Sequence, residues 1–127
     1  MNASTDDIIE EDDYMSITSL QEVKTFSEDR FTKRVLFQQG GGVTFVLHFL
    51  PGQQLPVHKH PGTDVILLVV EGTGTLILDG KEQAVKQEDV IHCGGEVEFA
   101  FHNTGDQEVR LFVVLNKVPA ASYAKDI

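Results

Sequence analysis

The segment from Gly52 to Gly72, GQQLPVHKHPGTDVILLVVEG, constrains the fold of this chain more than any other part of the sequence. It contains Val65–Val70, an unbroken run of apolar residues that predicts a strand buried on both faces. Two histidines, His58 and His60, precede this strand and are separated by a single residue. Because alternate residues of an extended chain point to the same side, both imidazoles can reach one common point, such as a metal ion.

The rest of the sequence from Val35 onward also predicts short strands separated by turns. The pair Asp79-Gly80 is the preferred sequence for a tight type I′ hairpin. No segment in this region has a helical period. The other predicted strands are Val43–Leu50, Asp89–Cys93, Val97–His102 and Val109–Leu115. Many short strands at regular spacing favour an all-β sandwich or small barrel.

Length and composition indicate one globular domain. The chain has 127 residues, of which 41% are hydrophobic, and it has no run of eighteen apolar residues. The start, MNASTDDIIEEDD, lacks the basic and apolar regions of a signal peptide. A single cysteine, Cys93, excludes an intrachain disulfide and fits a reducing compartment. We therefore expect a cytoplasmic protein.

The negative charge is concentrated at the N-terminus. The net charge is −10, and residues 1–23 contribute −7 of it because they hold seven acidic residues and no Lys or Arg. We expect residues 1–34 to form an acidic extension and barrel cover, with 16–34 lying over one end of the barrel, and residues 35–127 to form the single domain. The acidic head is either a solvated extension or a docking segment for a basic partner. Basic residues are nowhere concentrated, so neither nucleic acid nor a membrane is an expected partner.

The histidine segment resembles the first motif of the cupin superfamily. The resemblance is carried by the spacing Gly52-x5-His58-x-His60-x3-Asp64, and by Pro51, Pro61, Gly62 and the closing pair Glu71-Gly72. It extends over about residues 43–115. It implies an all-β double-stranded β-helix, a jelly roll of two antiparallel sheets, present in one copy. Small cupins commonly pair through an apolar sheet face, so the resemblance also implies a homodimer.

In this family a glutamate after the second histidine completes a metal shell. Counting forward from His60 reaches Asp64, whereas counting back from Gly72 reaches Val65. Either a bulge turns Asp64 inward as a ligand, or Val65 occupies the position of the missing carboxylate. The resemblance thus gives His58, His60 and Asp64 as the candidate ligands of a divalent metal such as Fe, Mn, Ni or Zn.

The second family motif supplies a further histidine ligand. Aligning GGEVEFAFHNTGD at Asn103 places Phe99 at that histidine's position. His102 lies three residues later with opposite parity, so we expect Phe99 to face inward and His102 to face outward. His48 and His92 also lie in or beside predicted strands and could complete the site, although a lone strand histidine is more often a packed, hydrogen-bonded residue.

Two classes of function remain open. The first is a binding cupin, whose barrel holds a small ligand, and in some cases a divalent metal, through an incomplete histidine site. The second is a metal-dependent enzyme, a dioxygenase, isomerase or decarboxylase, acting on a small anionic or aromatic molecule. The fold alone does not separate them, because one barrel hosts many chemistries.

Overall fold

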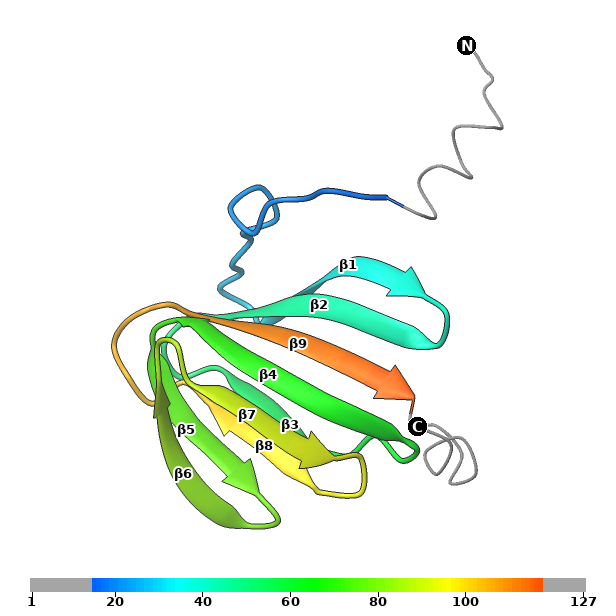
Figure 1. Ribbon diagram of the computed structural model, residues 1–127. Helices are drawn as coiled ribbons and strands as arrows, with labels where there is room; N and C mark the ends of the chain where they lie inside the picture. The colour runs from blue at the N-terminus through cyan, green and yellow to red at the C-terminus, as the bar shows by residue number, and fades with distance from the viewer. Residues whose placement is uncertain (1–14, 118–127) are drawn as a thin grey trace.

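Residues 15–117 are described by the computed structural model of the chain, and this part is built from β-strands (Figure 1). The strands are β1 (Thr32–Gln39), β2 (Gly42–Phe49), β3 (Gln54–His58), β4 (Thr63–Glu71), β5 (Thr73–Leu78), β6 (Lys81–Lys86), β7 (Val90–Gly94), β8 (Phe99–His102) and β9 (Val109–Lys117). β1 begins three residues before Val35, where the sequence predicts the first strand. The other predicted strands agree with the observed ones to within two residues at each end.

The strands form two antiparallel sheets that lie face to face. The five-stranded sheet has the order β1-β2-β9-β4-β7, and the four-stranded sheet has the order β3-β8-β5-β6. Neighbours in each sheet are often far apart in the chain, as in the pairs β2–β9 and β4–β9. The all-β double-stranded β-helix that the sequence predicts is therefore confirmed.

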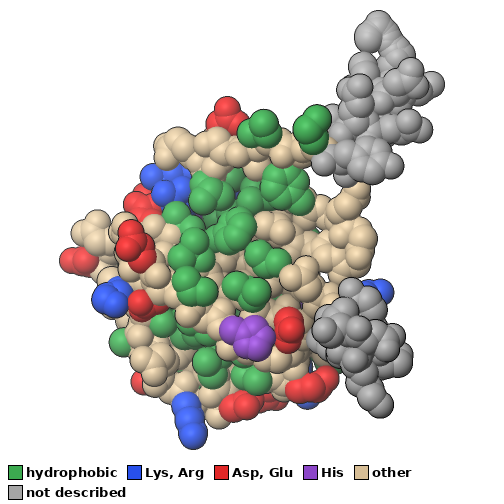
Figure 2. Space-filling view, viewed as in Figure 1, with side chains coloured by type: hydrophobic (Ala, Val, Ile, Leu, Met, Phe, Trp, Pro, Cys, Tyr) green, Lys and Arg blue, Asp and Glu red, His purple; other side chains and the backbone are tan. Residues whose placement is uncertain are grey.

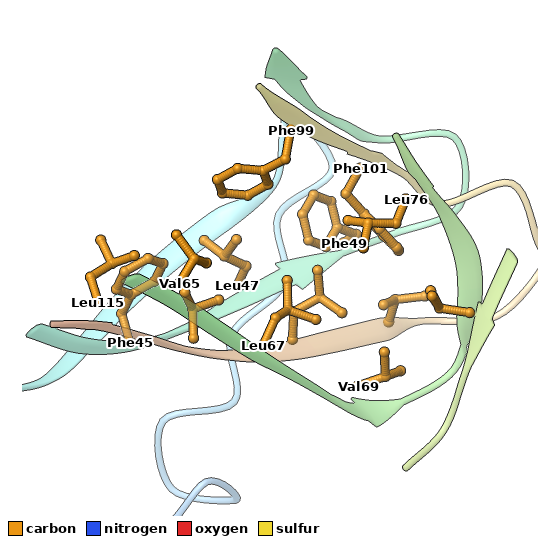
Figure 3. Packing of buried hydrophobic residues seen from close by; sticks show 14 residues of the cluster. Phe45, Leu47, Phe49, Val65, Leu67, Val69, Leu76, Phe99, Phe101 and Leu115 are labelled. Carbon is orange, nitrogen blue, oxygen red and sulfur yellow. The ribbon is translucent and has the colours of Figure 1, made fainter. Parts of the chain in front are cut away.

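The hydrophobic core lies between the sheets, because alternate residues of each strand point into it. The five-stranded sheet contributes the fully buried Phe49, Val69 and Leu111, and the four-stranded sheet contributes Phe101 and Leu76. Figure 3 shows these side chains converging from the two sheets, with Phe45, Val65, Leu115 and Phe99 at the other end of the core.

Two turns show why particular residues are needed. Asp79 and Gly80 have φ values of 49° and 81°, the positive values that a type I′ hairpin requires, so the predicted hairpin is confirmed. Gly72 has a φ of 90°, and a Cβ at this position would collide with the Glu108 carbonyl oxygen. No other residue fits where β4 ends and crosses toward β5.

The segment before β1 packs on the outer face of the five-stranded sheet. The ring of Phe26 lies edge-on to the ring of His48, with 5.2 Å between their centroids. The Ser27 carbonyl accepts a hydrogen bond from the Gln53 side chain, and the Thr25 hydroxyl accepts one from Arg34. The segment also reaches the β2–β3 turn at Gln53, and the ring of Phe31 stacks on the core residue Phe49. That 16–34 covers one end of the barrel stays a prediction.

Within residues 15–117, no helix is both long and apolar enough to cross a membrane.

Candidate ligand site

A tight turn after β3 positions the two histidines of the first motif. His58 ends β3, and His60 follows in the turn that leads to β4. The His60 amide donates to the Gly95 carbonyl at 2.9 Å, and the Thr63 hydroxyl donates to the His60 carbonyl at 2.8 Å. A Cβ on Gly95 would collide with the His60 and Thr63 carbonyl oxygens. The lack of a side chain at Gly95 therefore lets the β7–β8 connection hold His60 in place.

The rings of His58, His60 and Phe99 meet and form what we call the ring cluster. The His58 and His60 centroids lie 4.9 Å apart with the rings nearly perpendicular. The Phe99 centroid lies 4.3 Å from that of His58 and 5.8 Å from that of His60. β3 pairs with β8 so that His58 stands opposite Phe99. The two imidazoles thus lie side by side. That both reach one metal ion stays a prediction.

Local contacts fix the chemistry of both imidazoles. His58 Nδ1 lies 2.8 Å from the Pro56 carbonyl oxygen. Because a carbonyl can only accept, Nδ1 carries the proton, and Nε2 of the neutral ring is left with a lone pair. Burial lowers the pKa of His60, and the positive charge of His58 when its ring is protonated, together with that of Lys33, lowers it further. His60 is therefore a neutral imidazole around pH 7.

Phe99 occupies the position where the family's second motif has its histidine. Its side chain is buried and contacts both imidazoles. His102 has the opposite parity in β8 and stands between Gln54 and Thr75 on the outer face of the four-stranded sheet. The predicted orientations of Phe99 and His102 are confirmed.

Asp64 lies away from the ring cluster. β4 pairs with β7 and β9 in unbroken register at Asp64, and the bulge of this strand lies instead between Val69 and Glu71. Val65 is buried on the inner face, while Asp64 Oδ1 lies 3.4 Å from His92 Nε2 on the exposed outer face. Of the two alternatives from the sequence, the structure has the one in which Val65 takes the place of the carboxylate. The assignment of Asp64 as a ligand with His58 and His60 is not supported by this placement, because the strand has no bulge to turn the side chain inward.

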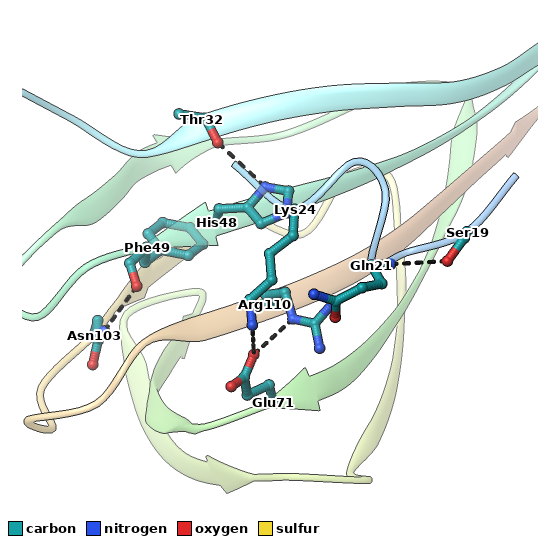
Figure 4. Close-up of polar contacts among 9 residues, drawn as sticks. All are labelled: Ser19, Gln21, Lys24, Thr32, His48, Phe49, Glu71, Asn103 and Arg110. Atoms are coloured by element: carbon teal, nitrogen blue, oxygen red, sulfur yellow. Dashed lines mark hydrogen bonds and ion pairs between the residues drawn. The ribbon is translucent and has the colours of Figure 1, made fainter. Parts of the chain in front are cut away.

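His48 also lies outside the ring cluster, on the outer face of the five-stranded sheet. It is fully buried beneath the N-terminal segment. The Thr32 hydroxyl donates to the Thr25 carbonyl at 2.6 Å, so at 3.2 Å it can only accept from His48 Nδ1 (Figure 4). Nε2 of His48 then has a bare lone pair and no partner within residues 15–117.

Polar residues that the sequence did not single out surround His48. Arg110 Nε donates to Glu71 Oε1 at 2.7 Å, and Lys24 Nζ lies 3.9 Å from the same oxygen (Figure 4). In the sequence, Glu71 is only one residue of the closing motif pair Glu71-Gly72. Its partners Lys24 and Arg110 are far from it in the chain. The bulge in β4 places Glu71 opposite Arg110. No pattern in the sequence predicts this bulge.

The described donor set does not fit a resident catalytic metal. Catalytic sites normally supply at least three protein ligands and keep one open position. In residues 15–117, no group of three or more His, Cys, Asp or Glu side chains is placed to hold a metal ion. Cys93, whose thiol pKa is raised by burial and by Asp64 and Asp79, packs against the core. Of the residues in this part of the chain, His58 and His60 remain as candidate ligands.

Comparison with known proteins places the chain among proteins of this architecture. It resembles the crystal structure of TT1209 from Thermus thermophilus, with a TM-score of 0.76, 22% identity, and coverage of 83% of this chain and 100% of that one. A protein with a double-stranded β-helix domain from Klebsiella pneumoniae also has a TM-score of 0.76, with 21% identity over 81% of this chain and 90% of that one. Both likenesses concern the fold.

Two curated proteins match part of the sequence. A 5-nitrosalicylic acid 1,2-dioxygenase from Bradyrhizobium sp is 30% identical over 64 residues, which is 50% of this chain and 30% of that protein. The polyketide synthase CurC from Streptomyces cyaneus is 30% identical over 61 residues, which is 48% of this chain and 40% of that protein. The chain thus spans less than half the length of either relative.

The model of the cupin domain family matches residues 45–115, more than half of the chain. This segment includes both histidines of the first motif and every strand from β3 to β8. Together with the two facing antiparallel sheets and the double-stranded β-helix relatives, it shows that the chain belongs to the cupin domain family.

Proposed function

We propose that this protein binds a small molecule at the ring cluster of His58, His60 and Phe99. The observation that carries the proposal is the convergence of two imidazoles and a phenyl ring at one point, while both imidazoles stay partly exposed. Solutes can therefore reach the cluster. The bare Nε2 of His58 accepts a hydrogen bond from the ligand, and the ring faces stack against an apolar or aromatic body.

The same two imidazoles support weak binding of a divalent metal. With only two protein ligands, water fills the remaining coordination positions of the metal. The metal therefore binds more weakly than it would at a site with three or four protein ligands. A metal held this way binds reversibly rather than as a resident cofactor.

An NMR titration tests the proposed ligand site. We expect small aromatic compounds to shift the ring signals of His58 and His60 and to leave those of His92 and His102 unchanged. The His60→Ala variant should lose the response, whereas His92→Ala, which alters an exposed histidine on the other sheet, should keep it. Shifts confined to His92 or His102 would contradict the proposal.

A second candidate function is metal-dependent catalysis by a dioxygenase, isomerase or decarboxylase. The partial similarity to the 5-nitrosalicylic acid 1,2-dioxygenase favours it. Elemental analysis of protein purified without an affinity tag or chelator decides between the candidates. Stoichiometric iron, manganese, nickel or zinc would favour the enzyme, and metal-free protein would favour the binding barrel.

We also propose that the barrel is a homodimer in the cytoplasm. The apolar outer face of the five-stranded sheet supports the dimer, because large exposed apolar patches mark association sites. The single cysteine supports a reducing compartment.

A further inference from the structure

Lys33 places an ammonium group at the ring-cluster end of the core. In the edge strand β1, Lys33 stands opposite Leu47 of β2, so its side chain lies on the inner face of the five-stranded sheet. Its Nζ lies 4.5 Å from the centroid of the Phe45 ring. Figure 3 shows Phe45 and Phe99 at the same end of the core, on opposing sheets. The positive charge of Lys33 is also among the charges that act on His60.

The ammonium of Lys33 differs from its neighbours because no carboxylate of the described residues pairs with it. Lys59, which lies between the two histidines, has Glu96 at 3.7 Å, and Lys24 has Glu71 at 3.9 Å. None of the ion pairs formed within residues 15–117 includes Lys33. Lys81 and Lys117 also have no ion pair among the described residues, so what sets Lys33 apart is its position beside the Phe45 ring at this end of the core.

Resting on the proposed function, we infer that Lys33 recognises an anionic group of the ligand and that the ligand is a small aromatic carboxylate. Three features of the site match such a molecule. The partly exposed imidazole rings, backed by Phe99, receive its ring, the ammonium of Lys33 receives its carboxylate, and the bare Nε2 of His58 receives a hydroxyl or amide donor. Contact with the Phe45 ring holds the ammonium at this end of the core rather than free in solvent.

The acidic composition of the chain supports the assignment of Lys33 as the group that binds the carboxylate. A net charge of −10 repels anions in general, so attraction of a carboxylate must come from a local cation. Lys33 is that cation, since the ammonium of Lys59 is already paired with Glu96.

Benzoate and methyl benzoate form a matched pair of probes, since they share a ring, lack a hydrogen-bond donor and differ chiefly in charge. We would titrate each into the full chain at low ionic strength and follow the histidine ring signals by NMR. The variants are Lys33→Gln and, as the control, Lys59→Gln, which removes the same charge from a lysine beside the same site. Both side chains are at least partly exposed, so both variants should fold.

We expect wild-type protein to bind benzoate about fivefold more tightly than methyl benzoate, the size of effect that one partly exposed ion pair gives. This preference should disappear in Lys33→Gln and persist in Lys59→Gln. Equal binding of the two probes by wild type, or an equal loss of preference in both variants, would overturn the role of Lys33 and leave the proposed ligand site intact. A wild type whose His58 and His60 signals respond to neither probe would overturn both.

Discussion

The buried imidazole of His48 makes the stability of the protein depend on pH. Burial lowers the pKa of His48 to about 4, and the positive charges of Arg110, Arg34 and Lys24 act in the same direction against the smaller opposing effect of Glu71. Protonation would place a second N–H on Nε2, which has no acceptor within residues 15–117. The folded protein therefore holds His48 neutral, whereas the unfolded chain protonates it near its ordinary value.

This difference predicts a loss of stability in mild acid. The folded pKa is below the unfolded one, so the unfolded state takes up the proton first as the pH falls, and stability decreases from about pH 6.5 down to about pH 4. Between pH 7 and pH 5 the free energy of unfolding should fall by about 2 kcal/mol through His48 alone. Urea unfolding of wild type and His48→Gln at both pH values measures this, and the variant should lose less stability between them. An equal loss in both proteins would assign the acid sensitivity to other groups.

A second prediction at this scale concerns the metal affinity of His58 and His60. Nickel, copper and zinc should bind more tightly than manganese, following the general order for nitrogen ligands. Imidazole binds metal only when neutral, so the affinity should fall in mild acid as protons compete for the rings. Calorimetric titration should show binding that His58→Ala removes. Binding that survives His58→Ala and is lost in His92→Ala would place the metal at the outer His92–Asp64 pair instead.

The sequence predicted individual residues well where a strand has one polar and one apolar face. Phe99 and His102 could be placed by parity because aligning the second motif gave a reference. His48 could not be placed, because both faces of its strand are apolar: Phe45, Leu47 and Phe49 face the core, and Val46 is also fully buried on the other face. What buries His48 is a segment some twenty residues earlier in the chain, and local periodicity carries no information about that contact.

At the scale of secondary-structure elements, the connection between β7 and β8 supports the turn that carries His60. Gly94 and Gly95 are adjacent, yet only at Gly95 would an added side chain meet another part of the chain. A Cβ at Gly95 would overlap the carbonyl oxygens of His60 and Thr63, whereas one at Gly94 would meet nothing within 4 Å. Neither glycine has a positive φ, so backbone strain does not distinguish the two positions. They differ only in the room available for a side chain.

Replacing these glycines therefore gives a matched comparison. Gly95→Ala should lower the stability by about 1–3 kcal/mol, the usual cost of overpacking, and should shift the ring signal of His60. Gly94→Ala should be close to neutral. Thermal unfolding and the histidine NMR spectrum measure both effects. If Gly94→Ala proved as damaging as Gly95→Ala, the contact with the His60 turn would not be the cause.

The existence of every strand except β3 followed from the sequence, but strand pairing did not. The hairpin at Asp79-Gly80 was predictable because local turn chemistry specifies it. The pairing of β4 with β9 joins residues 39 to 54 positions apart, and the bulge that brings Glu71 to Arg110 lies within that pairing. The family resemblance, and not periodicity, supplied this long-range arrangement.

At the scale of the whole molecule, the acidic head can be tested by deletion. Residues 1–14 lie outside the described part of the chain, so the prediction rests on the sequence. They have few large apolar residues to bury, and their carboxylates repel one another. Deleting residues 1–13 should leave the melting temperature nearly unchanged. A decrease of several degrees would show that Ile8 or Ile9 is docked on the barrel.

The outer face of the five-stranded sheet carries apolar side chains in register across its strands. Phe37, Val114 and Ile66 lie in one cross-strand row, and Phe112, Leu68 and Val90 lie in the next. Figure 2 shows a band of apolar side chains over this face of the molecule. Ile66 is 39% exposed and Val90 is 67% exposed, so the N-terminal segment leaves this part of the face open.

We expect a second copy of the chain to cover this face. A sheet face is self-complementary about a two-fold axis, and burying these apolar side chains would offset the entropy cost of association. Light scattering coupled to size-exclusion chromatography should give twice the mass of one chain for wild type and the mass of one chain for Val90→Asp. The control is Val57→Asp, which places the same charge on a similarly exposed valine, at 61%, in the four-stranded sheet. A wild-type monomer, or a dimer that Val57→Asp disrupts and Val90→Asp does not, would show that association does not use this face.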